Sequence, residues 1–146
     1  MATTPVATPL YTTTATAHGG RSGHVKSTDG VIDLQLAMPK EMGGPGGAKA
    51  NPETLFAAGY AACFEGALRL VARTQGKTLG DGVGITASVT IGKTPDGGFG
   101  LAVDLKGILP GMPREEAQKL MEDAHKVCPY SRATQGNIDV KVSVAQ

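Results

Sequence analysis

Apolar and polar residues alternate in four stretches of the chain, and a period of two is typical of half-buried β-strands. The alternating stretches lie within residues 32–38, 83–91, 99–105 and 138–144. Residues 10–17 and 24–26 are two further extended segments, the first of them rich in Thr. The turn sequence Asp96-Gly97-Gly98 favours a hairpin between the second and third alternating stretches.

The longest apolar segment predicts a central α-helix. Asn51 is a good N-cap, Pro52 suits the first helical position, and Gly76 ends the segment. Residues 55–64 are apolar on every side of this helix, which is typical of a helix wrapped by other elements. Gly59 lies inside the segment and predicts either a kink or a close approach of another group to the backbone.

A second helix is expected to begin at Pro113 and to end before Pro129. Its apolar positions follow helical spacing, and they are Ala117, Leu120, Met121, Ala124 and Val127. The resulting order of elements is β-β-β-α-β-β-α-β. Because consecutive strands pair as hairpins, this order predicts an α+β fold rather than a doubly wound one. A length of 146 residues fits a single domain, 1–146.

Charge and composition exclude several classes of function. The net charge is +1 with acidic and basic residues interspersed, so we expect neither nucleic acid nor an anionic membrane as a partner. Three Phe, three Tyr and no Trp argue against a stacking platform for single strands. The first ten residues lack the pattern of a signal peptide, and no segment is expected to be long enough to span a bilayer. We therefore expect a soluble cytoplasmic protein with reduced thiols.

The two cysteines occupy very different positions. Cys63 lies in the apolar central helix, and Cys128 lies at the end of the second helix. A thiol among small apolar residues is normally a compact core filler. Two thiols at such positions suggest instead a nucleophile and a resolving partner.

A nucleophilic Cys63 needs a cation nearby, because burial among apolar groups raises the pKa of a thiol. Arg21, flanked by Gly20 and Gly23, is a candidate, since glycines allow a loop to approach closely. Glu53 is a candidate partner that would orient the guanidinium. Two simpler interpretations stay open at this point: a solvated Arg in a turn, and an acid that complements the helix dipole.

Other chemistries are less well supported by the sequence. His125 and Cys128 are three residues apart and Cys63 could join them, but a zinc site would lack a clear fourth ligand, so we expect no metal. No pattern that forms an oxyanion hole or orients a base accompanies a Cys-His hydrolase. The glycine-rich segment 43–47 lacks the Lys-Ser/Thr of a phosphate-binding loop and is expected to be an ordinary loop.

Four segments of the chain form a recognisable set of motifs: residues 51–64 around Cys63, Gly19-Gly20-Arg21, Val127-Cys128-Pro129-Tyr130-Ser131 and the closing residues 136–140. In these motifs, and over nearly its whole length, the chain resembles the organic hydroperoxide resistance (Ohr) family of the OsmC-like superfamily. The resemblance implies antiparallel sheets around a long central helix plus a second helix, in an intertwined homodimer. It also implies a cytoplasmic bacterial thiol peroxidase that reduces organic hydroperoxides.

The same resemblance assigns roles to individual residues. Cys63 takes the peroxidatic role, and Cys128 takes the resolving role by forming a Cys63–Cys128 disulfide with the oxidised Cys63. Arg21 and Glu53 match the family's catalytic Arg–Glu pair. The implied external reductant is a dihydrolipoyl group carried on a protein, with no bound cofactor. The family more often has Asn and Arg where this chain has Arg132 and Gln135, a departure that bears on reductant docking or substrate preference.

An apolar pocket at the thiol would favour an alkyl or fatty-acid hydroperoxide, and its expected residues are Leu55, Phe56, Tyr60 and Phe64. Two functions of other classes remain as alternatives: a redox-sensing interaction protein without turnover, and a small-ligand carrier. Glu53 and Cys63 are ten residues apart on one helix, or about 15 Å along its axis. In a two-fold dimer, we expect Arg21 and Glu53 of one subunit to approach Cys63 and Cys128 of the other. A long Arg side chain and a kink near Gly59 would be the alternative within one chain.

Overall fold

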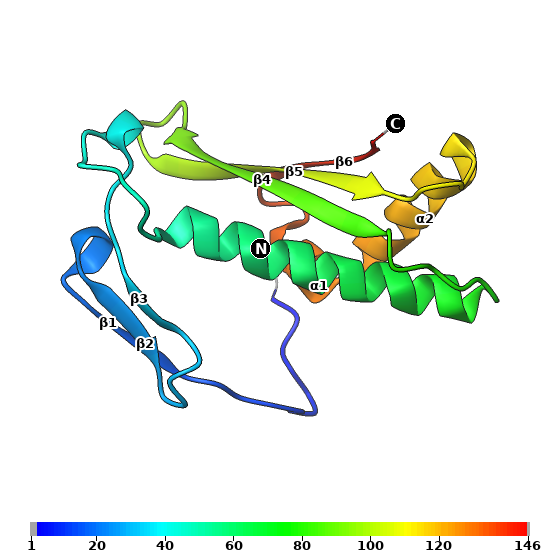
Figure 1. The fold of residues 1–146 in the computed structure, drawn as a ribbon, viewed down its shortest axis with the longest axis horizontal. Coiled ribbons are helices and arrows are strands. Elements are labelled where there is room, and N and C mark those ends of the chain that lie inside the picture. The colour runs from blue at the N-terminus through cyan, green and yellow to red at the C-terminus, as the bar shows by residue number, and fades with distance from the viewer. Residues whose placement is uncertain (1–2, 146) are drawn as a thin grey trace. The chain divides into compact units, whose positions relative to one another are not determined.

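The computed structural model describes residues 3–145 and confirms the α+β fold (Figure 1). The elements in chain order are β1 (Ala15–His18), β2 (His24–Ser27), β3 (Asp33–Gln35), α1 (Pro52–Thr74), β4 (Gly84–Lys93), β5 (Phe99–Ile108), α2 (Arg114–Val127), α3 (Pro129–Thr134) and β6 (Asp139–Val144). Short 3-10 turns lie at Gly20–Ser22 and Lys40–Met42. The chain forms two compact units divided between Pro52 and Glu53. That both belong to a single domain, 1–146, stays a prediction.

The first unit holds an antiparallel sheet in the order β1-β2-β3. Between β1 and β2 the chain turns through Gly19 and Gly20, whose φ angles of +82° and +59° lie in the left-handed region. A side chain at Gly23 would overlap the backbone of His18 and Gly19. The glycines flanking Arg21 therefore form the tight turn that the sequence predicts.

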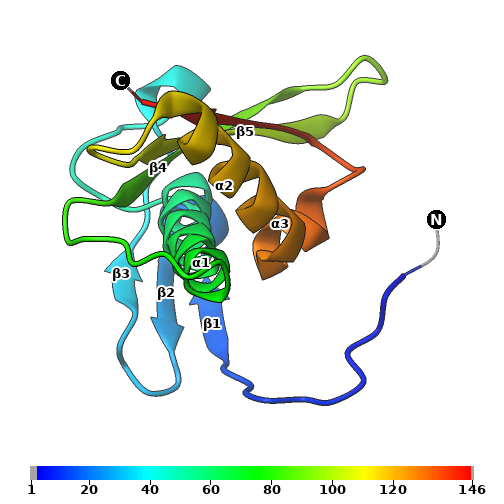
Figure 2. The ribbon, with the colours of Figure 1, turned by 90° about the vertical axis from the view of Figure 1, so that its right-hand side faces the viewer.

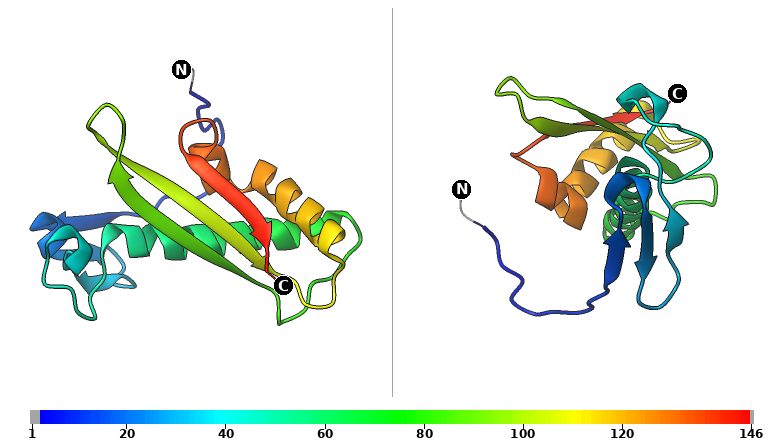
Figure 3. Two further views of the ribbon diagram at one scale, coloured as in Figure 1. Left: turned by 90° about the horizontal axis from the view of Figure 1, so that it is seen from above. Right: turned by 90° about the vertical axis from the view of Figure 1, so that its left-hand side faces the viewer.

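The second unit holds a three-stranded sheet in the order β4-β5-β6 that lies over α1 and α2 (Figure 3). β4 and β5 form the predicted antiparallel hairpin, from Lys93 opposite Phe99 to Gly84 opposite Ile108. β6, however, pairs with β5 in parallel, so the prediction of purely antiparallel sheets is wrong for this strand. The chain returns through α2 and α3 before β6, and a helical crossover of this kind joins parallel strands.

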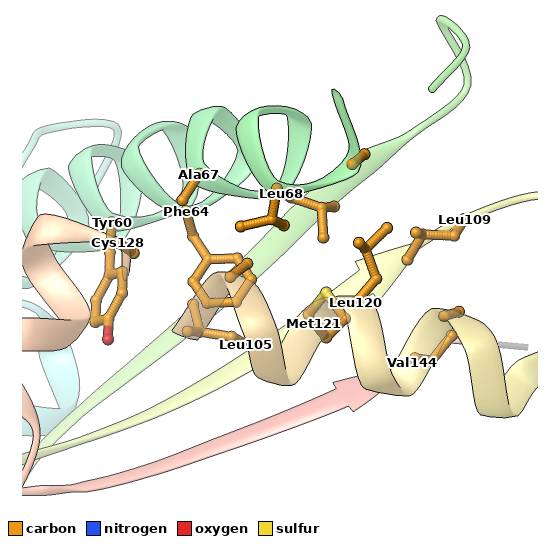
Figure 4. Packing of buried hydrophobic residues seen from close by; sticks show 14 of the residues in the cluster. Tyr60, Phe64, Ala67, Leu68, Leu105, Leu109, Leu120, Met121, Cys128 and Val144 are labelled. Carbon is orange, nitrogen blue, oxygen red and sulfur yellow. The ribbon is translucent and has the colours of Figure 1, made fainter. Parts of the chain in front are cut away.

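The core of the second unit lies between α1, α2 and the inner face of the sheet (Figures 2 and 4). Tyr60, Phe64 and Leu68 extend into it from α1, and Leu120 and Met121 from α2. The predicted apolar face of α2 is thus confirmed at its four central positions, Ala117, Leu120, Met121 and Ala124. The fifth position differs, since 44% of Val127 is exposed at the end of the helix.

α1 is a continuous helix with the predicted ends. It begins at Pro52, runs to Thr74 and is followed by Gly76, whose φ is +74°. Gly59 does not break it. A Cβ at Gly59 would lie 3.1 Å from the hydroxyl oxygen of Tyr130, so this glycine allows the close approach that was one of the two predicted roles.

Pro129 begins a helix as well as ending one. α2 stops at Val127, Cys128 adopts an extended ψ of 125°, and Pro129 opens the six-residue α3. The residue before a proline is driven out of the helical region, and proline itself fits the first helical position. The sequence predicts the end of α2 before Pro129 but not the start of α3 at this residue, because a proline after a helical pattern indicates the end of a helix.

α1 is also long and apolar enough to cross a membrane, by length and composition alone. Its most apolar window has a mean hydropathy of 1.4, which corrects the expectation that no segment reaches the required length. Central helices of soluble proteins have the same length and composition. Since Tyr60, Phe64 and Leu68 are fully buried in the second unit, we attribute the apolar character of α1 to core packing.

Candidate active site

The two cysteines meet in the second unit. α1 presents Cys63, and the break between α2 and α3 presents Cys128, with 3.5 Å between their sulfur atoms. Both thiols are free; Cys128 is completely buried and Cys63 is partly exposed. A disulfide has an S–S distance of about 2.05 Å, so a small movement would join them.

The surroundings of Cys63 work against its ionisation. Burial raises the pKa of the Cys63 thiol, the backbone N–H of Tyr130 lowers it through a hydrogen bond, and the neighbouring Cys128 thiol raises it again. Burial dominates these influences, and the hydrogen bond from Tyr130 is the favourable one. A nearby positive charge would be needed to favour a reactive thiolate at this position.

The predicted Arg–Glu pair is divided between the two units. Arg21 lies in the 3-10 turn Gly20–Ser22 of the first unit, and Glu53 lies in the first turn of α1 in the second. Because α1 is unbroken, Glu53 and Cys63 are about 15 Å apart along its axis. The approach of Arg21 and Glu53 to a thiol stays a prediction.

The four residues expected to line an apolar pocket differ in exposure. Tyr60 and Phe64 are completely buried in the core, whereas Leu55 and Phe56 are partly exposed. Phe56 also stacks on Tyr130, with 6.0 Å between ring centroids and 16° between their planes. Sequence reasoning missed Tyr130 as a member of this aromatic group, although it is only two residues from Cys128. A role in substrate binding stays a prediction for all four residues.

A polar cluster unforeseen from the sequence lies next to the thiols. The Tyr60 hydroxyl is 2.8 Å from Ser131 Oγ and 3.1 Å from Thr134 Oγ1, and His125 Nδ1 is 2.7 Å from Ser131 Oγ. Ser131 is completely buried and Thr134 nearly so. Buried hydroxyls need such partners, and these link α1, α2 and α3.

His125 contacts a hydroxyl group and an aromatic ring in this structure. Within residues 3–145, no three His, Cys, Asp or Glu side chains are close enough together to hold an ion. The Nδ1 atom of His125 is occupied by Ser131, and its ring lies against Phe64 at 6.3 Å between centroids. That the chemistry needs no bound metal or cofactor stays a prediction.

We expect His125 to make the protein less stable in mild acid. Burial lowers the pKa of His125 below its usual value near 6.5, so the unfolded chain takes up a proton that the folded chain resists. The contribution of His125 to the free energy of unfolding is therefore present above about pH 6.5 and is lost as the pH falls below it. Urea unfolding at pH 7.5 and 5.5 measures this, with His125→Asn as the comparison.

The wild-type protein is expected to lose more stability than His125→Asn over this pH range. The other charged groups are the same in both proteins, so their contributions cancel in the comparison. Among them are Lys119, Glu122, Asp123 and Lys126, which line a surface cavity of about 690 Å³ with His125. Equal losses in the two proteins would contradict the assignment to His125.

Comparison with known proteins places the chain in a family. Residues 44–143 match the family model described as OsmC-like protein. A curated organic hydroperoxide resistance protein from Xanthomonas axonopodis pv. citri (strain 306) is 53% identical over 136 residues, covering 93% of this chain and 95% of the relative. The chain therefore belongs to the organic hydroperoxide resistance proteins of the OsmC-like family.

Solved structures agree with this assignment. The crystal structure of an organic hydroperoxide resistance protein OsmC from Legionella pneumophila matches with a TM-score of 0.88 and 54% identity, covering 95% of this chain and all of that one. The structure of OhrB from Bacillus subtilis matches with a TM-score of 0.85 and 45% identity, over 94% of this chain and 100% of that one.

Proposed function

We propose that this protein is a cysteine-based peroxidase that reduces organic hydroperoxides to alcohols. The observation that carries the proposal is the pair of free thiols 3.5 Å apart, one partly exposed and one buried. The names of the relatives support the substrate class, since they refer to resistance to organic hydroperoxides.

In the first step, the Cys63 thiolate attacks the outer oxygen of R–O–OH. The O–O bond breaks, Cys63 becomes a sulfenic acid, and the alkoxide takes up a proton to leave as the alcohol. Arg21 would favour the thiolate over the thiol and stabilise the charge developing on the departing oxygen. Glu53 would hold the guanidinium in position.

In the second step, Cys128 attacks the sulfur of the sulfenic acid. A Cys63–Cys128 disulfide forms, and the sulfenic oxygen leaves as water with the proton of the Cys128 thiol. The short distance between the two sulfur atoms favours this reaction over a second oxidation of Cys63 by peroxide.

A dihydrolipoyl group on a partner protein would then restore the thiols. Its two thiols exchange in turn with the Cys63–Cys128 disulfide, which leaves two cysteine thiols and a cyclic lipoyl disulfide. Arg132 and Gln135 are exposed at α3 and just after it, where they would be accessible to such a partner. A cytoplasmic location fits this chemistry, since cysteines are kept reduced there.

A homodimer would bring a cation to Cys63. Ala58, Ala62 and Gly66 are exposed at a spacing of four residues on α1, and Leu70 continues this line with 46% of its surface exposed. Small residues in such a line allow the same helix of a second subunit to approach closely. Arg21 and Glu53 of that subunit would then reach Cys63.

The experiment that tests the function is turnover of an alkyl hydroperoxide with excess dihydrolipoamide. Loss of many equivalents of hydroperoxide per protein, with release of the alcohol, is expected. A single equivalent consumed would favour the redox-sensing alternative, and binding of the hydroperoxide without any loss would favour the ligand-carrier alternative.

Organic hydroperoxides are expected to react faster than hydrogen peroxide. Each buried methylene contributes about 0.8 kcal/mol, so three buried carbons raise kcat/KM by roughly 50-fold. Steady-state rates with cumene hydroperoxide and hydrogen peroxide measure the ratio. Phe56→Ala should reduce the ratio by slowing only the organic substrate, whereas equal kcat/KM values in the wild-type protein would contradict an apolar binding site.

A further inference from the structure

The polar cluster beside the thiols is a directional chain of hydrogen bonds. The Thr134 hydroxyl donates to the backbone carbonyl of Ser131 at 3.2 Å, which uses its only proton. Tyr60 must therefore donate to Thr134, and Ser131 must in turn donate to Tyr60. The bond between His125 and Ser131 then requires the proton to be on His125 Nδ1.

The hydrogen bonds of the polar cluster and the thiol pair have matching positions along α1 and at the start of α3. Tyr60 precedes Cys63 by three residues on α1, and Ser131 follows Cys128 by three residues at the start of α3. The hydrogen bond between Tyr60 and Ser131 thus lies one helical turn from the contact between the two sulfur atoms. It fixes the position of α3 along α1, and with it the position of Cys128.

The centre of the cluster, at Tyr60 and Ser131, is completely buried. Tyr60 is completely buried with Phe64 and Leu68, so its hydroxyl cannot exchange its partners for water (Figure 4). α3 has only six residues, and a helix of this length has little stability of its own. Its placement depends on contacts with its neighbours, and Ser131 and Thr134 provide the polar ones.

We propose that Tyr60, Ser131 and His125 are positioning residues that hold the Cys128 thiol against Cys63 and so set how readily the Cys63–Cys128 disulfide forms. The proposal deepens the proposed function and rests on it for the role of that disulfide. None of the three residues needs to touch a substrate, and each acts through the placement of α3.

The main test measures the disulfide without any hydroperoxide. Wild-type protein and Tyr60→Phe are equilibrated in buffers of reduced and oxidised dithiothreitol, and the oxidised fraction is determined by alkylation and mass spectrometry. Tyr60→Phe keeps the ring but removes the central hydroxyl, and the equilibrium constant for disulfide formation is expected to fall by roughly fivefold to tenfold. Tyr11→Phe, which removes a hydroxyl from an exposed ring in the first unit, should retain the wild-type constant.

A second pair of variants separates positioning from general stability. His125→Asn retains an N–H donor near the position of Nδ1 and should keep most of the wild-type equilibrium constant for disulfide formation. His125→Leu has no such donor and should lower this constant as Tyr60→Phe does. Thermal unfolding of the reduced proteins is measured in parallel. A lower melting temperature with an unchanged constant in Tyr60→Phe and His125→Leu would overturn the proposal and leave a structural role only.

The same variants can be exposed to excess cumene hydroperoxide. Tyr60→Phe is expected to give several-fold more sulfinic acid at Cys63 than the wild-type protein, because slower resolution leaves the sulfenic acid open to a second oxidation. If the wild-type protein does not react with the hydroperoxide, the proposed peroxidase function fails, while the dithiothreitol equilibrium still decides the role of the hydrogen bonds.

Discussion

Cys63→Ser is expected to lose at least about a thousandfold in hydroperoxide turnover. A serine hydroxyl does not ionise near neutral pH, and the second unit already disfavours the thiolate at this position, since burial raises the pKa of Cys63. The variant should nevertheless fold, because serine is close to cysteine in size and Cys63 is partly exposed. Loss of cumene hydroperoxide with dihydrolipoamide measures the effect.

Cys128→Ser is the matched control for this prediction. It retains Cys63 and should still consume about one equivalent of hydroperoxide in the absence of reductant, after which mass spectrometry should find sulfenic or sulfinic acid at Cys63. Multiple turnovers by Cys63→Ser would show that another group is the nucleophile. An unmodified Cys63 in the oxidised Cys128→Ser protein would contradict the resolving role of Cys128.

The second large effect is expected from mixed dimers. Arg21→Ala and Cys63→Ser should each be nearly inactive as homodimers, the first because burial raises the pKa of the thiol and the arginine that would counter this rise is absent. If Arg21 acts on the thiol of the other subunit, a heterodimer of the two variants contains one complete site and regains about half of the wild-type activity per dimer. The unbroken α1 supports this arrangement, since Glu53 and Cys63 are on one straight helix.

Two differently tagged variants, co-expressed and purified through both tags, provide the heterodimer. A heterodimer of Arg21→Ala with the double variant Arg21→Ala/Cys63→Ser is the control, since neither of its sites has an arginine. Heterodimers of the single variant Arg21→Ala with the single variant Cys63→Ser are then verified and assayed. If their activity stays at the level of this control, each subunit builds its site alone.

The elements that the sequence predicts best are those with strong local signals at both ends. α1 has Asn51 before it, Pro52 at its first position and Gly76 after it, and its bounds agree with the prediction. α3 was missed because a six-residue helix has too few positions to show a period, and Pro129 is compatible with both an end and a beginning. β6 shows the same period of two in parallel and antiparallel pairing, so its direction depends on the crossover and not on its residues.

The candidate site shows the same distinction between local and tertiary information. Cys63 and Cys128 could be chosen from the sequence because their positions are unusual, and the structure brings their sulfur atoms within 3.5 Å. Ser131 and Thr134 could not be chosen as site residues from the sequence, because serine and threonine are mostly found on protein surfaces. Only the packing of α3 against α1 shows that both are buried and bonded to Tyr60.

The closeness of the two thiols also restricts the kind of electron donor that can reduce their disulfide. A Cys63–Cys128 bond closes a loop of roughly 65 residues, and closing such a loop in the unfolded chain costs about 4 kcal/mol of conformational entropy. The folded protein has already brought the sulfur atoms to 3.5 Å, so by thermodynamic linkage folding favours the disulfide by a similar free energy, equivalent to a reduction potential about 90 mV lower.

A monothiol that attacks this disulfide forms a mixed disulfide with one cysteine, and the other cysteine lies close enough to expel it again. A dithiol escapes this reversal, because its own second thiol displaces the protein sulfur and closes a ring. If the proposed disulfide forms, we therefore expect the oxidised protein to resist glutathione-like reductants and to need donors that carry two thiols.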